Sequence, residues 1–352
     1  MDSDLLTRIG NTPGIPGFEN DIQDLIADEL SAVCDEVRRD HLGNVIALKK
    51  ATQPPSGDQR PTRLMLAAHA DEIGMMVKHI NDKGLIHFIR VGGIFISCVE
   101  SQRVLIHGKE TIRGVIVPKW DTADKRPDMG DLLIDTGLSK EKLEEIAPPG
   151  TPITYDSDTS ELNDGLWVGR NFDNRIGSYC LVDAMRQVGD TSVDVYAVSS
   201  TQEEVGLRGA RPAAFGVAPD IGIAIDGSMT RGAYVKDKDN LCVPGEGTGI
   251  YMIDKMTIGH PRLVQYLFDL CEKRDIAYQR NIGGGTDAKA IQQSRAGVIA
   301  TTIGAPVQYM HSTVQLCHAD DMDATVALLA AIMETAHEFY DGLPENTDPF
   351  NG

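Results

Sequence analysis

Short apolar runs rich in β-branched residues alternate along the chain with stretches whose apolar positions recur at helical spacing. Four of these runs predict buried strands, because they are nearly continuous in apolar residues and end abruptly at polar ones. They are Leu64–Ala68, Val195–Val198, Ile221–Ile225 and Val298–Ile303. The alternation of strands with helices predicts an α/β fold in which a mixed sheet is flanked by helices.

Amphipathic patterns predict the helices of this fold. The apolar residues recur every three or four positions, so each helix would bury one face against the sheet. The first pattern begins at Glu19 or Asn20, after the turn residues of NTPGIPGFEND, and ends near Leu30. The later patterns are Asp173–Val188, His260–Arg274, a shorter one within Asn281–Gln293, and Asp320–Tyr340.

The pattern changes between about Gly74 and Asn163, where helical spacing nearly vanishes and short β-like runs are separated by glycine and proline. This pattern predicts a small β-rich, barrel-like domain, residues 74–163, inserted into a catalytic domain made of residues 1–73 and 164–352. Its polar segment Val117–Asp131 is expected to be an exposed loop. Its apolar run Val91–Ile96 is expected to be exposed and to be buried against a partner.

Side chains that carry chemistry follow the four strand-like runs, at the point where each run ends. They are His69 and Asp71 after the first run, Glu203 and Glu204 after the second, Asp226 after the third and His311 after the fourth. Ligands of open α/β sheets bind beyond the carboxyl ends of the strands, so these side chains could meet at one rim. Asp173, at the start of a helical pattern, is a further candidate. Imidazoles and carboxylates without cysteine suit zinc, cobalt or manganese.

The adjacent carboxylates of Glu203 and Glu204 repel each other, and in an apolar setting one of them would take up a proton. A divalent cation removes that penalty, since one carboxylate binds the metal and the other stays free as a base. An isolated Glu-Glu pair more often lies in a solvated acidic loop. The three other strand-like runs with the same kind of ending favour the metal site.

The net charge of −19, from 52 acidic and 33 basic residues, argues against nucleic-acid binding, which needs a basic face. The excess carboxylates repel one another unless salt screens their charges. This favours a halophilic protein over an ordinary acidic one. No window approaches the ~18 apolar residues of a membrane span, and MDSDLLTRIG lacks the features of a signal peptide. Six scattered cysteines without a CxxC pair are typical of a cytoplasmic protein.

Several motifs, in order along nearly the whole chain, resemble those of the tetrahedral (TET) aminopeptidases, dinuclear-metal peptidases related to glutamyl and leucyl aminopeptidases. They are PGIPGFEND, DHLGNVIA, AAHADEIG, GRNFDNRIG, STQEEVGLRGA, AIDGS, GGGTDA and the late His311. The resemblance implies a zinc-peptidase-like catalytic domain, a PDZ-like insert that makes dimers, and a hollow tetrahedral dodecamer. One departure is Asn174, where the family often carries a second aspartate; it affects the hydrogen bonding around the site.

The chemistry of the residues and the resemblance assign the same metal ligands. Asp173 would bridge two divalent ions, zinc or cobalt with manganese as a further option, which two-metal sites hold ~3.5–4 Å apart. His69 and Asp226 would complete the first metal. Glu204 and His311 would complete the second.

Three more carboxylates have roles around these ligands. Asp71 would accept the second N–H of the His69 imidazole and so fix its tautomer. Glu203 would be the general base, which takes a proton from the attacking water and returns it to the leaving amine. Asp287, within GGGTDA, is a candidate for holding the terminal ammonium of the substrate.

These roles predict an aminopeptidase that acts on peptides with a free amino terminus. A related metal amidohydrolase, deacylase or carboxypeptidase would use much the same ligands without requiring a free α-amine. An endoglucanase would instead need two metal-free carboxylates flanking a sugar. The non-enzymatic alternative is a shell-forming protein, which would have no use for a complete set of ligands.

Overall fold

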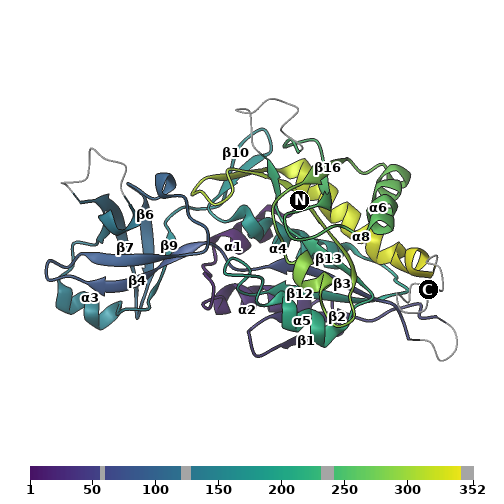
Figure 1. The fold of residues 1–352 in the computed structure, drawn as a ribbon, viewed down its shortest axis with the longest axis horizontal. Coiled ribbons are helices and arrows are strands. Elements are labelled where there is room, and N and C mark those ends of the chain that lie inside the picture. The colour runs from purple at the N-terminus through teal and green to yellow at the C-terminus, as the bar shows by residue number, and fades with distance from the viewer. Residues whose placement is uncertain (56–59, 120–127, 231–241, 342–352) are drawn as a thin grey trace.

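The computed structural model describes residues 1–55, 60–119, 128–230 and 242–341, and its larger part is a mixed sheet between helices (Figure 1). Within these residues, eight strands form the sheet in the order β1 (Glu36–Arg39), β2 (Val45–Lys49), β12 (Asp194–Ser200), β3 (Arg63–His69), β13 (Ile221–Ile225), β17 (Ile299–Gly304), β15 (Thr248–Ile253) and β16 (Tyr278–Ile282). The strands β12, β3, β13 and β17 are parallel neighbours, whereas β2 and β15 run antiparallel to them. The four runs predicted as strands thus lie side by side, and the α/β fold is confirmed.

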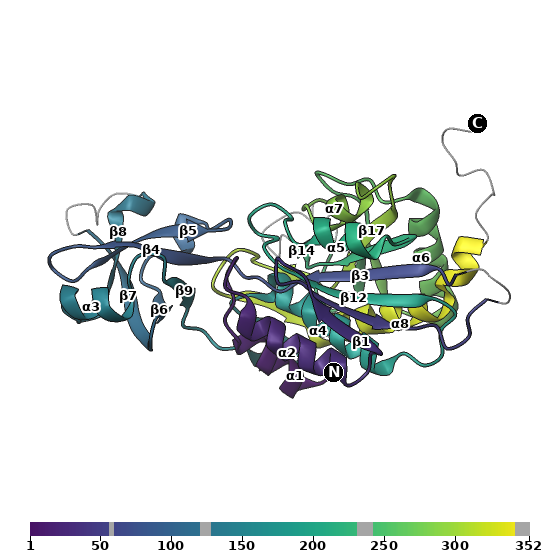
Figure 2. The same cartoon turned by 90° about the horizontal axis from the view of Figure 1, so that it is seen from below.

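Alternation along β3 separates the two faces of the sheet. Leu64 and Leu66 pack into one apolar cluster, and Met65 and Ala67 pack into another on the opposite face. The first face carries α1 (Ser3–Asn11), α2 (Asn20–Ser31), α4 (Phe172–Gln187), α6 (Pro261–Arg274) and α8 (Ala319–Asp341), and the second carries α5 (Ala210–Val217) and α7 (Ala288–Gln292). Figure 2 shows α5 and α7 on one side of β3 and β12, with α1, α2 and α4 on the other. Because both faces are covered, the central strands are apolar throughout.

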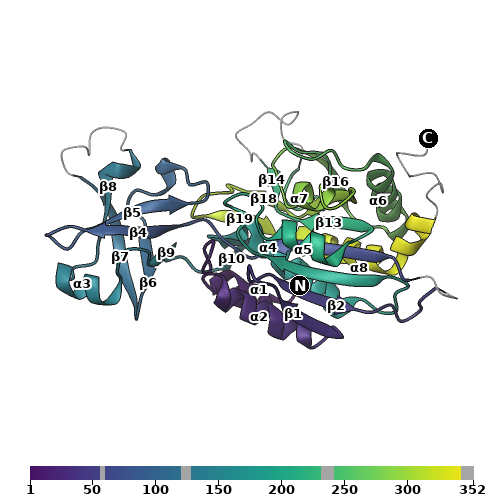
Figure 3. The same ribbon diagram turned by 60° about the horizontal axis from the view of Figure 1, so that its bottom comes forward.

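The insert forms a closed barrel that projects from the α/β part of the molecule (Figure 3). Its strands follow the order β4 (Gly74–Ile80), β5 (Ile86–Val91), β8 (Leu132–Asp135), β7 (Thr111–Pro118), β6 (Arg103–His107) and β9 (Pro152–Tyr155). The barrel has an apolar core of its own, to which the helix α3 (Lys140–Ile146) contributes Leu143 and Ile146. The predicted barrel-like architecture is therefore present in the structure.

The end of the insert differs from the prediction. A second sheet has the order β10 (Ser160–Asn163), β11 (Leu166–Gly169), β19 (Gln315–His318), β18 (Pro306–Gln308) and β14 (Ser228–Thr230). The sequence analysis assigned Ser160–Asn163 to the insert, but β10 pairs with β11 and so belongs to the sheet beside the catalytic part. The last strand of the barrel ends at Tyr155. Composition alone does not reveal with which strand a segment pairs, and this pairing decides to which sheet the segment belongs.

Two further expectations concern exposed segments and membranes. The predicted loop Val117–Asp131 lies partly outside the described residues, since 120–127 are not among them. The run Val91–Ile96 is not the exposed apolar strip that was predicted: Ile94 is 3% exposed within the barrel core, although Phe95 is 60% exposed. No helix in the described part of the chain is long and apolar enough to cross a membrane.

Candidate metal centre

Asp173, in the first turn of α4, stands between two histidines from distant parts of the chain. Its Oδ1 atom lies 3.3 Å from His69 Nε2, and its Oδ2 atom lies 3.1 Å from His311 Nε2. A carboxylate that offers one oxygen to each of two imidazoles is arranged to bridge two cations.

Two clusters of possible ligand atoms share this carboxylate. One consists of His69, Asp173 and Asp226, the other of Asp173, Glu204 and His311, and the ligand atoms of each cluster lie within 4.8 Å of one another. His69 Nε2 is 3.9 Å from Asp226 Oδ1, and His311 Nε2 is 3.7 Å from Glu204 Oε2. The structure thus brings together all five predicted ligands, in the two groups that the sequence analysis assigned.

The register of the parallel strands explains why these side chains meet. His69, the last residue of β3, is directly opposite Ser200, the last residue of β12. Asp226 follows the last residue of β13, and its backbone N–H donates to the carbonyl of Ile303 on β17 at 3.0 Å. The candidate ligands therefore share the carboxyl edge of the sheet, where α/β proteins bind their ligands.

Both adjacent glutamates reach this edge because the chain turns sharply after β12. Gln202 has a φ of 56°, and the Asp71 carboxylate accepts hydrogen bonds from the backbone N–H groups of Glu203 and Glu204, each at 3.0 Å. His69 Nδ1 donates to the backbone carbonyl of Asp71 at 3.1 Å and lies 3.5 Å from Asp71 Oδ1. The hydrogen bond from the imidazole thus goes to the backbone carbonyl of Asp71 and not to its carboxylate, which was the predicted acceptor. The Asp71 carboxylate instead holds the turn that carries the two glutamates.

The start of α4 is fixed by side-chain amides. The Gln315 side-chain oxygen accepts a hydrogen bond from the backbone N–H of Asp173 at 2.7 Å. The amide of Asn174 donates to the carbonyl of Ile225 at 2.7 Å and accepts from the N–H of Gly177 at 3.0 Å. Asn174 uses both ends of its amide in this way, whereas an ionised aspartate could not donate to the carbonyl.

The electrostatics of the clusters fit a bound cation. Burial, reinforced by neighbouring carboxylates, raises the pKa values of Glu203, Glu204 and Asp226, that of Glu204 to about 8. For Asp173, burial opposes ionisation, but hydrogen bonds from His311 and His69 hold the pKa below its usual range. The carboxylates thus carry more buried negative charge than two imidazoles offset.

One oxygen atom supports the same conclusion. Glu204 Oε1 is buried and has no hydrogen-bond partner among the described residues, although Glu204 Oε2 faces His311. A cation would satisfy this atom and offset the repulsion among the carboxylates. The donors are imidazole nitrogens and carboxylate oxygens, so the residues fit zinc, cobalt or manganese.

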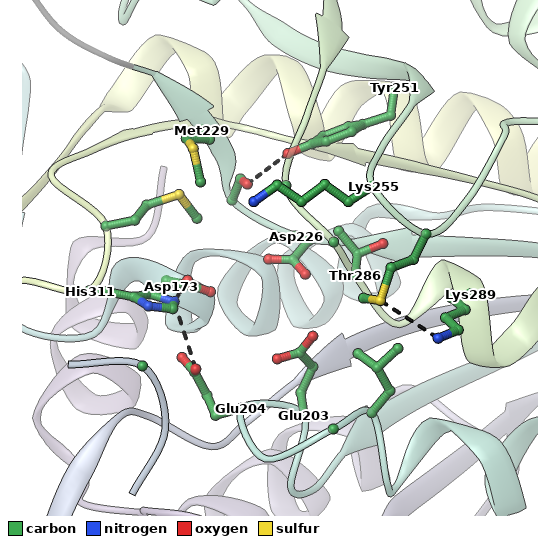
Figure 4. Close-up of a pocket in the computed structure, with 18 of the residues that line it drawn as sticks. Asp173, Glu203, Glu204, Asp226, Met229, Tyr251, Lys255, Thr286, Lys289 and His311 are labelled. Atoms are coloured by element: carbon green, nitrogen blue, oxygen red, sulfur yellow. Dashed lines mark hydrogen bonds and ion pairs between the residues drawn. The ribbon is translucent and has the colours of Figure 1, made fainter. Parts of the chain in front are cut away.

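The clusters open onto a cavity of about 500 Å³, shown in Figure 4. Glu203 lines this cavity beside Glu204 and Asp226. Asp287 does not line it: the side chain is 2% exposed, and its Oδ2 atom accepts a hydrogen bond from Ser200 Oγ at 2.5 Å. The structure therefore gives no support to the predicted contact between Asp287 and a substrate ammonium.

The sequence analysis missed two parts of the wall. The backbone of Gly93, from the insert, lies against the His311 ring, and the rings of Phe95 and His311 lie 6.5 Å apart. Lys255 and Lys289 line the opposite part of the cavity. The adjacent glycines of VGGIFI could have indicated a close approach of the backbone. Lys289 directly follows the motif GGGTDA, whereas no local pattern marks Lys255.

Comparison with known proteins identifies the family to which the chain belongs. The family described as M42 glutamyl aminopeptidase matches residues 43–328. The chain belongs to the peptidase M42 family. It is 34% identical to the lysyl aminopeptidase of Pyrococcus furiosus, over 95% of this chain and 97% of that protein.

Solved structures agree with this M42 assignment. An aminopeptidase of the archaeon Desulfurococcus kamchatkensis has a TM-score of 0.91 at 32% identity, covering 96% of this chain and 95% of its own. The TET1 peptidase of Pyrococcus horikoshii, which can assemble into a tetrahedron or a large octahedral shell, has a TM-score of 0.83 at 28% identity, covering 94% and 98%. The M42 chain is therefore a metal-dependent aminopeptidase of the TET type. This is the activity that the sequence analysis preferred to the deacylase, carboxypeptidase, endoglucanase and purely structural alternatives.

Proposed function

We propose that this aminopeptidase holds two divalent cations, zinc or cobalt with manganese as an alternative, and uses Glu203 as its general base. The observation that carries the proposal is the Asp173 carboxylate, whose two oxygens face His69 and His311. The other members of the two clusters, Asp226 and Glu204, would complete the two sets of ligands.

Glu203 is suited to proton transfer because it belongs to neither cluster yet lines the cavity, with Oε2 3.9 Å from His69 Nε2. Bound divalent cations lower the pKa of water from ~15.7 toward about 7, which makes a nucleophile available at neutral pH. Glu203 accepts the proton of the attacking water and delivers it to the leaving amine as the peptide bond breaks.

A free amino terminus is expected to be required for this reaction. An aminopeptidase acts at a free amino terminus, which N-acetylation removes, so acetylated aminoacyl amides should be cleaved at least about 100-fold more slowly than their unblocked forms. The measurement is kcat/KM for matched pairs of substrates. Equal rates for both members of each pair would contradict the proposal and indicate a deacylase or endopeptidase.

We also propose a tetrahedral dodecamer built from dimers, with the barrel insert as the dimerisation domain; the similarity to the TET1 peptidase supports this assembly. With a net charge of −19 per chain, carboxylate repulsion should loosen the particle when salt falls below ~0.5 M. Sedimentation velocity at high and low salt would measure this loss. A particle that stays intact in millimolar salt would refute the prediction that the protein is halophilic.

A further inference from the structure

We propose that the barrel insert forms a subsite for the second residue of the peptide, in which Arg90 binds a carboxylate that follows the cleaved bond. This carboxylate is the α-carboxylate of a dipeptide or the side chain of an acidic second residue. The inference rests on the proposed aminopeptidase mechanism and extends it to the leaving part of the substrate. It gives the insert a role in substrate binding in addition to the proposed role in assembly.

Two hollows meet at the second ligand cluster. The main cavity, of about 500 Å³, and a depression of about 400 Å³ on the barrel side share Gly93, Glu204 and His311 in their walls. Figure 4 shows Glu204 and His311 together at one side of the main cavity. The other residues that line the depression all belong to the insert and are Arg90, Gly92, Ile94 and Phe95.

The direction of the substrate follows from where the reacting groups lie. An aminopeptidase has only one residue before the bond that it cleaves, so the rest of the peptide leaves the site on a single side. The proposed base Glu203 and the carboxylate of Asp173 line the main cavity and not the depression. The main cavity therefore receives the first residue, and the barrel-side depression receives the residue that follows the cleaved bond.

Two adjacent glycines bring the backbone of the insert close to the ligands. A Cβ atom at Gly92 would lie 3.3 Å from Glu204 Oε2, and one at Gly93 would lie 2.8 Å from His311 Nδ1. Because glycine has no side chain, nothing from these two residues fills the space between the ligands and the depression. A peptide that extends from the metal centre on this side therefore contacts the insert with its second residue.

Arg90 provides the charge of this subsite. It is an exposed residue near the end of β5, and apart from His311 no other cationic side chain of the described residues lines the depression. Within the described part of the chain, the guanidinium of Arg90 pairs with no carboxylate. A guanidinium binds a carboxylate through two parallel hydrogen bonds, so the substrate would supply the partner that the protein does not.

The spacing along the strand suits this contact. Residues of a strand rise by ~3.4 Å each, which places the Cα atom of Arg90 about 7 Å from that of Gly92, beside the ligands. The α-carboxylate of a dipeptide lies about one residue, ~3.5 Å, beyond the cleaved bond. The long side chain of Arg90 can span the remaining distance.

Phe95 adds an apolar wall to the same depression. The side chain is exposed, and its ring centroid lies 6.5 Å from that of His311. An exposed aromatic ring beside a metal ligand offers apolar surface to the side chain of the second residue. A dipeptide with an apolar second residue would thus use Phe95 through its side chain and Arg90 through its carboxylate.

The test compares two pairs of dipeptides, with the first residue held constant as the one that the wild type cleaves fastest. In the first pair leucine is the second residue, and the carboxyl terminus is free or amidated. In the second pair both members are amidated, and the second residue is glutamate or glutamine. The measured quantity is kcat/KM of the full-length, metal-loaded enzyme at one salt concentration, because salt screens the contact.

An arginine–carboxylate contact at a partly exposed site predicts that the acidic member exceeds the neutral member by about 3- to 10-fold in at least one pair. A preference in the first pair identifies the α-carboxylate as the partner of Arg90. A preference in the second pair identifies the side chain.

Variants show whether Arg90 causes the preference. Arg90→Met keeps similar length and removes the charge, so the ratio of acidic over neutral substrate should fall toward equality. Arg90→Lys should retain part of the ratio, and Arg90→Glu should reverse it, a gain that a misfolded protein cannot produce. Arg103→Met, on the exposed surface of β6 in the same barrel, is the matched control and should keep the wild-type ratios, since Arg103 lines neither hollow.

The outcomes distinguish this inference from the proposed function. Equal rates within both pairs, or a preference that Arg90→Met and Arg90→Glu leave unchanged, would overturn the inference alone. No cleavage of any unblocked substrate by the metal-loaded wild type would overturn both.

Discussion

Replacement of Glu203 by glutamine is expected to lower turnover by roughly 10²- to 10⁴-fold, the contribution typical of a general base. Glutamine keeps the shape and reach of the side chain but cannot accept a proton. Because Glu203 lies in neither ligand cluster, the cations should remain bound. The quantity to measure is kcat on a saturating unblocked aminoacyl substrate.

The neighbouring substitution Glu204→Gln is the matched control, since it makes the same chemical change one residue away. Glu204 faces His311 at 3.7 Å and belongs to the second cluster. Loss of the Glu204 carboxylate should weaken metal binding first. Activity should therefore fall when the metal concentration is limiting and recover in part when metal is added in excess. Recovery of Glu203→Gln by added metal, with no recovery of Glu204→Gln, would mean that the two roles are exchanged.

Replacement of Gly93 by alanine is expected to weaken metal binding by about 10- to 100-fold, although Gly93 belongs to the barrel insert. A Cβ atom at this position would lie 2.8 Å from His311 Nδ1 and 3.1 Å from its Cε1 atom. The imidazole must then move, which disturbs its approach to Asp173. The φ of Gly93 is not in the left-handed region, so the effect is one of contact rather than of backbone strain.

The control for this variant is Gly130→Ala in the same insert, because a Cβ atom there would meet nothing within 4 Å among the described residues beyond its own chain neighbours. The measurement is the concentration of zinc or cobalt that restores half of the activity to the chelated enzyme. Gly130→Ala should match the wild type. A Gly93→Ala variant that also matches it would show that the barrel does not support the metal centre.

The candidate ligands could be predicted from the sequence because each one follows a recognisable structural signal. Buried parallel strands are apolar along their whole length, so the first polar residue marks the carboxyl edge of the sheet. His69 and Asp226 stand at this edge for that reason, and the helical pattern that begins at Asp173 marked the residue proposed to bridge the two metals.

The sequence could not predict contacts made by segments that are far apart in the chain. The Asp71 carboxylate holds the N–H groups of Glu203 and Glu204, which explains how two adjacent side chains reach one site, but nothing in HADEIG shows this partner. The approach of Gly93 to His311 depends on how the barrel packs against the catalytic part. For the same reason the sequence analysis placed residues 160–163 within the insert, although Ser160–Asn163 pairs with β11, since pairing partners are not encoded locally.

The cavity wall illustrates a different limit. Lys255 follows no motif, and although Lys289 directly follows GGGTDA, only the fold brings the two lysines to the side of the cavity away from His311. The sequence indicated a reaction through its ligands, whereas the preferred substrate depends on residues that become neighbours only in three dimensions.

The metal content of purified wild-type protein and of its Glu203→Gln and Asp173→Ala variants tests the two-metal account most directly. Elemental analysis should find two divalent ions per subunit in the wild type and in Glu203→Gln, which keeps its metal but not its turnover. Asp173→Ala should lose both ions, because one carboxylate serves both clusters. Full wild-type activity with a single ion per subunit, or an Asp173→Ala variant that keeps both, would contradict the account.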